Sequence, residues 1–376
     1  MKPKLELRLL SVAALGLILL FTVTEKSKAS VESYGNIQSE LTYAELINGE
    51  MENTLVNNIS FNSNLKLSTD KTSGFLNLKG DYENDELTLS LNKAYISYQN
   101  DSLAFEIGKD RFLKGVGFGW NPSDLMNPSK SPLYREEEKR GEDVGINLAS
   151  VSYFGDKGSL VYEISAVVIP GESYSDMKKV LLTKLINGSF EWFFIGGFQT
   201  GQKNIYGGYF RASIPYFDKA TMYGEFQSTE FQSNNKHLLG VQLNPEISLL
   251  RGSLQFQAEY FYNQSGCKNM SEYFIKNPNA IPVLGESLQH YYYTGSVYND
   301  ISSRFFFGVI WNADEDKSGV VNFLYSKFIS KECLFKIGGY SCFFSDSEKE
   351  FAKLTNTRLT IYAGLSIYFN VSNTSE

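Results

Sequence analysis

The sequence predicts an all-β protein: a single transmembrane, antiparallel, up-and-down β-barrel of about 16 strands (14–18), with one loop folded into the barrel or capping its mouth. Three observations lead to this fold class. The N-terminus has the pattern of a secretory signal, and rows of alternating apolar and polar residues follow along the rest of the chain. After residue 29, no apolar run reaches the roughly 20 residues that a membrane helix needs.

Composition excludes several classes of protein. The chain has 376 residues, of which 42% are hydrophobic and 15% aromatic, so it is too apolar to be disordered. The formal charge of −7 argues against nucleic acid as a partner, because phosphate binding needs a basic face. With two His in the whole chain, we expect no catalytic site, no metal site and no cofactor.

Residues 1–29 are predicted to be a signal peptide. A basic start with Lys2, Lys4 and Arg8 precedes the apolar run 9–23 and a small, polar stretch that ends at Ala29, where we expect cleavage. The alternative is an uncleaved membrane anchor. The segment carries five basic and two acidic residues, so its removal leaves a formal charge of about −10.

The remaining chain is predicted to consist of strands. In residues 55–67, most apolar side chains (Leu55, Ile59, Phe61, Leu65 and Leu67) occupy odd positions and most polar ones (Asn58, Ser60, Asn62, Asn64 and Lys66) occupy even positions, which gives one apolar and one polar face. Further apolar rows with this period are Leu87 to Leu91, Leu103 to Ile107, Leu160 to Val168, Phe190 to Phe198, Leu254 to Tyr262 and Leu359 to Phe369. Residues 175–186 fit a short helix or a strand equally well.

Several rows run for about ten residues, the length of a tilted membrane-spanning strand. A barrel would turn the apolar face to lipid and the polar face to water, whereas a secreted β-sandwich or β-propeller would bury the apolar faces against each other. We favour the barrel. The expected domains are a lead-in and first strand at 30–54, the barrel at 55–369 and a polar C-terminal tail at 370–376.

The last strand resembles the assembly signal of bacterial outer-membrane barrels. Gly364, Ile367 and Phe369 fit its pattern of a glycine followed by alternating hydrophobic residues that end in an aromatic one. The resemblance implies the barrel-assembly machinery as a partner. In that pattern the chain usually ends at the aromatic residue, but here seven polar residues follow it.

A second resemblance covers residues 103–148. There, a strand that ends in Gly-Lys is followed by a glycine-rich stretch and a Trp-Asn-Pro loop. This segment resembles one found in porin-like and alginate-export-like channels, which implies a channel rather than an enzyme. The matching residues are Gly108, Lys109, Arg111, Gly115, Gly117, Trp120, Asn121, Pro122, Asp124, Asn127 and Pro128.

The long segment 110–142 is the candidate functional loop. Its glycines give backbone freedom and its prolines stiffen the chain, so we expect a loop of fixed shape that folds into the lumen or caps one mouth. Mixed charges at a narrowing would control which solutes pass; the alternative is a solvated surface loop. The predicted constriction residues are Lys109, Arg111, Lys114, Asp124, Arg135 and Arg140, and the predicted loop-structure residues are Gly115, Gly117, Trp120, Asn121, Pro122, Asn127 and Pro128.

Other residues give weaker signals. Cys333 and Cys342 could meet across a turn and form a disulfide, or they could be free. A barrel-type lipid hydrolase needs a Ser–His pair, but His237 has no matching serine motif, and we expect His290 in a long external loop. Residues 263–300 form the other long segment without clear period.

The predicted function is therefore passive diffusion of small polar solutes through a porin-like channel in a bacterial outer membrane, with outer-membrane lipid as the surroundings and a homo-oligomer as a possible assembly. A barrel of about 16 strands leaves an aqueous channel. Acidic groups that face the lumen would favour cations mildly. The alternatives are a non-conducting surface barrel, either adhesin or structural protein, and, third, a barrel-type lipid hydrolase.

Overall fold

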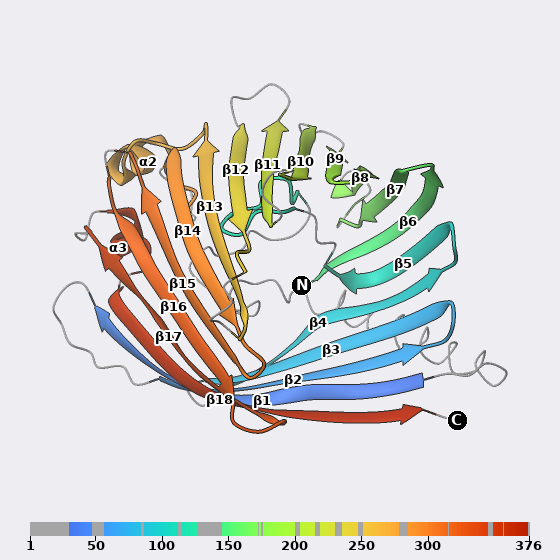
Figure 1. Ribbon diagram of the computed structural model, residues 1–376, viewed down its shortest axis with the longest axis horizontal. Helices are drawn as coiled ribbons and strands as arrows, with labels where there is room; N and C mark the ends of the chain where they lie inside the picture. The colour runs from blue at the N-terminus through green and yellow to red at the C-terminus, as the bar shows by residue number, and fades with distance from the viewer. Residues whose placement is uncertain are drawn as a thin grey trace.

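The computed structural model describes residues 30–46, 56–83, 86–111, 115–125, 145–171, 173, 176–199, 204–214, 219–229, 235–246, 251–277, 285–314, 316–344, 349–355 and 357–374. In these residues, eighteen strands form one antiparallel sheet (Figure 1). The strands are β1 Ser30–Leu46, β2 Val56–Ser68, β3 Thr72–Glu83, β4 Glu86–Gln99, β5 Leu103–Asp110, β6 Ile146–Lys157, β7 Leu160–Ile169, β8 Lys178–Asn187, β9 Phe190–Gln199, β10 Ile205–Ser213, β11 Ala220–Thr229, β12 Lys236–Leu243, β13 Ser253–Asn263, β14 His290–Asn299, β15 Ser303–Asn312, β16 Gly319–Phe328, β17 Cys333–Phe343 and β18 Thr357–Thr374, and two short helices are α2 Met270–Lys276 and α3 Glu350–Thr355.

The sheet closes on itself. Each strand pairs with its neighbours in sequence, and β18 also pairs with β1 from Ser30↔Thr374 to Leu46↔Thr357. Closure leaves the sheet without an edge, so every strand has two hydrogen-bonded neighbours. The all-β, antiparallel, up-and-down barrel that the sequence predicts is confirmed.

The strand number needs correction, because the described residues hold 18 strands and not about 16. Glycine pairs weaken the alternation by which strands are counted. Gly207 and Gly208 lie within β10, and Gly338 and Gly339 lie within β17. Glycine has no side chain to mark either face, so these rows show a weak period two.

Three further expectations change. Residues 370–374, expected in a polar tail, continue β18 and pair with the start of β1. Cys333 and Cys342 are both free and lie on the same strand, β17, nine residues apart, which is about 30 Å of extended chain. They therefore cannot form a disulfide with each other. His290 is the first residue of β14, and not part of an external loop.

The two ends of the barrel differ. At the end that also holds both termini of the described chain, β2–β3, β4–β5, β6–β7 and β8–β9 are joined by two or three residues each. At the opposite end, the connections 111–145 and 264–289 are the longest of the chain. Short turns at one end and long loops at the other are typical of outer-membrane barrels, where the long loops face outward.

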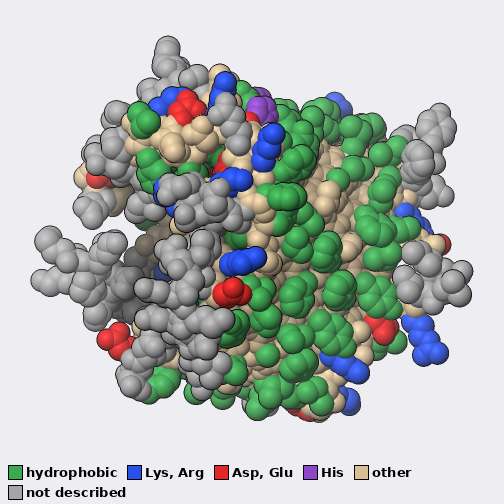
Figure 2. Space-filling model, turned by 90° about the vertical axis from the view of Figure 1, so that its left-hand side faces the viewer, with side chains coloured by type: hydrophobic (Ala, Val, Ile, Leu, Met, Phe, Trp, Pro, Cys, Tyr) green, Lys and Arg blue, Asp and Glu red, His purple; other side chains and the backbone are tan. Residues whose placement is uncertain are grey.

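The outer wall of the barrel is apolar. Leu89 is 67% exposed, Leu239 58% and Leu181 53%, while polar Ser165 and Glu259 on inward positions are almost fully buried. Figure 2 shows hydrophobic side chains spread over the wall of the barrel on the face that it presents. This distribution is the reverse of a soluble β-sandwich, which is therefore contradicted.

Among the described residues, no helix is long and apolar enough to cross a membrane.

Packed side chains fill part of the interior. One buried cluster lies inside β11–β17 and includes Trp120, Phe261 and Tyr291, and a second lies inside β6–β10 and includes Val180 and Phe193. Residues 115–125 and the two helices contribute to these clusters. The interior is thus a partly filled lumen and not an empty tube.

If the apolar wall contacts lipid, a charge on it must be costly. We expect Leu181→Arg, at an exposed position of β8, to lower the free energy of unfolding by roughly 2–4 kcal/mol in lipid vesicles. Ser60→Arg, on an inward position of β2 opposite Gln38, is the matched control and should change it by much less. Urea titration followed by tryptophan fluorescence measures both. Equal destabilisation by the two variants would contradict the assignment of the faces.

Candidate functional site

The inner wall of β1–β5 is polar and is accessible to water in part, since Gln38, Glu40, Asn77 and Asn92 are buried while other inward residues are exposed. Its inward positions carry amides and hydroxyls that bond across strands: the Asn77 amide donates to the side-chain oxygens of Asn62 and Asn64, and the hydroxyls of Ser73 and Ser97 lie 2.7 Å apart. Tyr34, also on an inward position, is 38% exposed. These groups form a hydrophilic surface inside a barrel whose outside is apolar.

Charged side chains on the same wall are arranged in pairs across strands or along them. The ammonium nitrogen of Lys66 lies 3.9 Å from the Glu32 carboxylate, that of Lys79 lies 3.5 Å from Asp81, and that of Lys93 lies 3.5 Å from Asp110. Each of these lysines is thus matched by a carboxylate. Further acidic residues on inward positions of this wall are Glu40 and Glu106.

The opposite wall is covered. Inward side chains of β11–β15 are almost inaccessible to water: Tyr223 is 2% exposed, Glu225 3%, Phe261 1% and Ile310 0%. Residues 115–125 lie against this wall, and Figure 1 shows part of this segment, in teal, inside the ring of strands beside β11 and β12. The segment from the β5–β6 connection therefore folds into the barrel, as one of the two sequence alternatives expected.

A buried carboxylate on β11 holds the first half of this segment. Glu225 Oε1 accepts the backbone N–H groups of Val116 at 2.6 Å and Gly117 at 2.5 Å. Its Oε2 accepts the N–H of Ser123 at 3.1 Å and the Ser123 hydroxyl at 2.7 Å. With four hydrogen bonds to the segment, Glu225 is a strong anchor.

A second carboxylate, on β13, holds the middle of the segment. Glu259 accepts the N–H of Phe118 through Oε1 and that of Gly119 through Oε2 at 2.8 Å. The Tyr223 hydroxyl donates to the same Oε1 at 2.8 Å. Together, the two carboxylates satisfy five backbone N–H groups that would otherwise be buried without partners, since the segment has no strand to pair with.

Trp120 packs the segment onto the wall. It is 2% exposed, and its ring is stacked on Phe261 with centroids 5.0 Å apart and planes 9° apart. Its indole N–H donates to the carbonyl oxygen of Gly285 at 2.7 Å. A buried tryptophan that has both ring contacts and a partner for its N–H fixes position as well as excluding water.

The backbone of the segment needs its glycines. Gly115 has φ of +132°, which side chains of L residues rarely allow. A Cβ on Gly117 would lie 2.0 Å from the carbonyl oxygen of Trp120. After this tight approach, the Asp124 N–H donates to the Asn121 carbonyl at 3.1 Å and closes a turn over the buried Pro122.

Two of the expected constriction residues fasten the segment. Arg111 Nη2 lies 3.9 Å from Asp124 Oδ2, and their side chains are only 1% and 7% exposed. A pair that is this buried links the start of the connection to its middle, and it presents little charge to water. The geometry therefore gives Arg111 and Asp124 a holding role.

Lys109 lies on the other face of β5. Its register places it with the outward-facing Phe105 and Ile107, and its ammonium donates to the Leu91 carbonyl at 2.6 Å. Lys114, Arg135, Arg140, Asn127 and Pro128 lie outside the described residues. The predicted constriction made by this set of charges therefore stays a prediction.

A third buried carboxylate organises the long loops above β14–β17. Glu350 in α3 accepts the Tyr291 hydroxyl at 2.6 and 2.8 Å, and its Oε1 also accepts the N–H groups of Gly285 at 3.1 Å and Ser287 at 3.4 Å. Its own N–H donates to Asp316. Burial, with a smaller contribution from Asp316, raises the pKa of Glu350 to about 8.

The sequence analysis missed the three anchors Glu225, Glu259 and Glu350. Glu259 stands in the polar row of β13, between the outward Ala258 and Tyr260. In the sequence, such an anchor is visible as a carboxylate in the middle of an inward-facing polar row. This pattern does not distinguish a carboxylate that holds a loop from one that faces an open lumen. Within the described residues, no group of three or more His, Cys, Asp or Glu could hold a metal ion.

Comparison with known proteins supports the architecture. No protein-family model matches the sequence, and no curated protein matches it either. Among solved structures, Pseudomonas aeruginosa OccK5 (OpdH) aligns with TM-score 0.54 at 8% identity, over 93% of this chain and 99% of that one. P. aeruginosa OpdQ aligns with TM-score 0.53 at 8% identity over 93% and 99%, and Acinetobacter baumannii OccAB3 with 0.56 at 8% identity over 91% and 99%.

At 8% identity, the likeness shows a shared fold, the closed antiparallel barrel. The resemblance of the 103–148 motif to alginate-export-like channels has no support among these comparisons and stays a prediction.

Loss of both anchors should release the in-folded segment. We expect Glu225→Ala combined with Glu259→Ala to expose Phe118 and Trp120. The double variant removes the acceptors of the five backbone N–H bonds that hold the segment against the wall. Chymotrypsin should then cut within 115–125. The control is Glu191→Ala, an inward carboxylate bound to Lys184 and Tyr209. Resistance of the double variant to cleavage would contradict the anchoring role.

Glu350 should make stability depend on pH. Its pKa in the folded protein, about 8, lies above its ordinary value of 4.5, so the folded protein holds a proton that the unfolded chain releases. The stabilisation is complete below pH 4.5 and is lost as the pH rises towards 8. Urea titrations from pH 5 to pH 8 should therefore show a fall in the free energy of unfolding that is smaller in Glu350→Gln. The control Glu272→Gln, at a partly exposed carboxylate paired with Lys276, should show the same fall in the free energy of unfolding as the wild type. If the free energy of unfolding depends on pH in the same way for wild type and Glu350→Gln, the prediction is refuted.

Proposed function

We propose that this protein is a porin-like channel of a bacterial outer membrane that passes small polar solutes by passive diffusion. One observation carries the proposal. The barrel has an apolar outside, while its lumen is filled along β11–β15 and is polar and partly water-accessible along β1–β5. An 18-stranded barrel is wide enough to leave an aqueous path beside a folded-in segment.

The in-folded segment favours a channel over a barrel with a purely structural role. Its backbone is held by two carboxylates and a stacked tryptophan, so its shape is fixed and it narrows the lumen in a defined way. A fixed obstruction sets the size of the solutes that pass. The predicted residues Lys114, Arg135 and Arg140 belong to the same connection, and we retain them as candidate constriction charges.

The wall charges favour cations. Lys66, Lys79 and Lys93 are each paired with a carboxylate, and Glu40 and Glu106 are additional acidic groups on inward positions of the wall. An acidic excess in a low-dielectric tube attracts cations. This agrees with the acidic charge of the chain outside residues 1–29.

Membrane insertion is part of the proposal. Ile367 and Phe369 of the last strand are 58% and 40% exposed on the outer wall, while Gly364 lies on an inward position opposite Glu40. This arrangement suits the predicted assembly signal and its recognition by the barrel-assembly machinery. Signal-peptide cleavage after Ala29 and a homo-oligomer remain proposals, and residues 1–29 lie outside the described residues.

A second candidate function is a non-conducting surface barrel. The observation that favours it is the filling of half of the lumen by residues 115–125, α2 and α3. A lipid hydrolase has less support. In the described residues, His290 contacts the Tyr260 hydroxyl at 2.7 Å and Asp314 at 3.9 Å, and His237 is stacked against Tyr262, so neither histidine shows the serine contact that a hydrolase needs.

Planar-bilayer recording tests conduction directly. The wild-type protein should give discrete conductance steps in KCl, and the Glu225→Ala/Glu259→Ala variant should give larger and noisier ones, because a released segment no longer narrows the lumen in one position. Glu191→Ala should behave as wild type. Insertion without any conductance step would favour the non-conducting barrel.

The same preparation tests selectivity. In a KCl gradient, the reversal potential of the wild type should indicate a mild preference for potassium over chloride. Replacing Glu40, Asp81 and Glu106 by their amides should move the reversal potential towards zero or to the anion side, since the additional acidic groups are then removed and Lys79 loses its carboxylate partner. A preference for anions in the wild type would contradict the assignment.

A further inference from the structure

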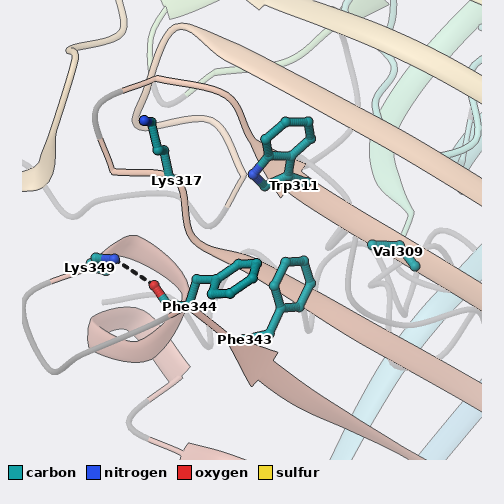
Figure 3. A pocket seen from close by; sticks show the side chains of 6 residues that line it. All are labelled: Val309, Trp311, Lys317, Phe343, Phe344 and Lys349. Carbon is teal, nitrogen blue, oxygen red and sulfur yellow. Dashed lines mark hydrogen bonds between the residues drawn. The ribbon is translucent and has the colours of Figure 1, made fainter.

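A crevice opens on the outside of the barrel, away from the lumen. It has a volume of about 590 Å³ and is lined by Val309, Trp311, Lys317, Phe343, Phe344 and Lys349 (Figure 3). Val309 and Trp311 lie on the outward face of β15, and Phe343 lies on that of β17. The other three residues belong to the connections β15–β16 and β17–β18 at the long-loop end. The crevice therefore lies where the apolar wall meets the loops.

A missing side chain creates the hollow. In the register of β15–β17, Gly319 of β16 stands directly between Trp311 and Phe343. The next outward positions of β16 carry the side chains of Val321 and Phe323, whereas Gly319 contributes none. The Phe343 ring leans over Gly319, where an added Cβ would lie 2.2 Å from the ring. The result is an apolar recess with aromatic side walls, and Trp311 is stacked in turn on Tyr292 of β14 at 5.8 Å.

Two ammonium groups stand at the loop side of the recess. Figure 3 shows Lys317 and Lys349 on that side of the aromatic rings. The Lys349 ammonium donates to the Phe344 carbonyl at 2.6 Å, which fixes it at the rim. The described carboxylates of these two connections are Asp314, Asp316 and Glu350, and Glu315, Asp346 and Glu348 lie outside the described residues. Asp316 and Glu350 are buried, with the Glu350 N–H donating to Asp316 at 2.8 Å, and Asp314 accepts the N–H groups of Gln289 and His290. The three described carboxylates are directed to these partners and not to the rim.

The backbone at the rim is unusual. Lys317 and Phe344 both have φ of +50°, and among the described residues they are the non-glycine residues with positive φ. A bulky residue in the left-handed region is uncommon and is retained where the surroundings or a function require it. Here the conformation brings one lysine and one phenylalanine to the same crevice from two different loops.

We propose that this crevice binds a phosphorylated acyl lipid of the membrane leaflet at the long-loop end. The recess between Trp311, Phe343 and Val309 would take an acyl chain, and Lys317 and Lys349 at its loop side would each pair with a phosphate oxygen of the head group. Apolar contact below and positive charge above, at the upper limit of the lipid-facing wall, match an anionic amphiphile rather than a soluble ion. The proposal rests on the membrane insertion of the barrel and not on its conductance, so a non-conducting barrel would bind the lipid equally.

Native mass spectrometry of the full-length protein, refolded in a nonionic detergent, tests the proposal with lipid A as the probe. The wild type should retain one lipid A molecule. Lys317→Gln and Lys349→Gln should each weaken retention about five-fold, since a lysine near an anionic head group contributes about that factor. Lys317→Arg with Lys349→Arg should retain the lipid because both charges remain. Trp311→Ala should weaken retention through the lost apolar contact.

The control variant is Lys327→Gln with Lys331→Gln, which removes two exposed lysines at the opposite rim of β16. It should bind as the wild type does, and zwitterionic phosphatidylcholine with matched chains should not be retained. Equal retention by the Lys317→Gln/Lys349→Gln double variant would overturn the proposal. Displacement of lipid A by inorganic phosphate would also overturn it, because it indicates an ion site. A dimer mass in place of the lipid adduct would overturn it as well, because it indicates a second copy of the chain on this surface. Conductance of the same variants in planar bilayers distinguishes a failure of the lipid-binding proposal from a failure of the proposed channel function.

Discussion

Closure of the sheet through β1 and β18 is the constraint on which the rest of the structure depends. A strand in contact with lipid has no water to satisfy its N–H and C=O groups, so each must find a partner within the sheet. The long pairing of β1 with β18, from Ser30↔Thr374 to Leu46↔Thr357, supplies that partner for the two ends of the chain. Polar-looking residues 370–374 are part of it, because backbone pairing does not depend on an apolar side chain.

Closure also creates a wide interior, which loops and side chains have to fill or line. A barrel of 18 strands is too wide for inward side chains to fill, so loops enter it. A loop in the lumen has unpaired backbone groups of its own, and buried carboxylates from two strands of the wall and from α3 accept hydrogen bonds from them. Glu225 and Glu259 take five N–H groups from residues 116–123, and Glu350 takes two from residues 285–287. The same solution therefore occurs twice, around different loops.

The anchors divide the lumen into two unlike halves. Along β11–β15 the wall carries carboxylates and aromatic rings that are covered by the loops, and along β1–β5 it carries amides, hydroxyls and paired charges that remain in contact with water. Outside the barrel, the long-loop rim has a feature of its own in the crevice beside Gly319, where aromatic residues and lysines come together. For the proposed channel function, the positions at which the loops are fixed therefore matter more than chemically reactive side chains.

The sequence by itself determined the class of fold and the two faces of most strands. Alternation with period two is a local property, so the row from Leu254 to Tyr262 could be assigned to the outside and Gln257 and Glu259 to the inside, as the burial of these residues confirms. The glycines and Trp120 of the in-folded segment were likewise visible, because tight turns need particular residues.

Tertiary structure alone decided the strand number, the site of the loop and the roles of its charges. Glycine pairs in β10 and β17 weaken the alternation by which strands are counted. Arg111 and Asp124, predicted to line a constriction, are instead buried against each other. The anchors of residues 116–119 lie more than 100 residues further along the chain, at Glu225 and Glu259. A local pattern shows which face of a strand is polar, but only closure of the barrel brings that face against a particular loop.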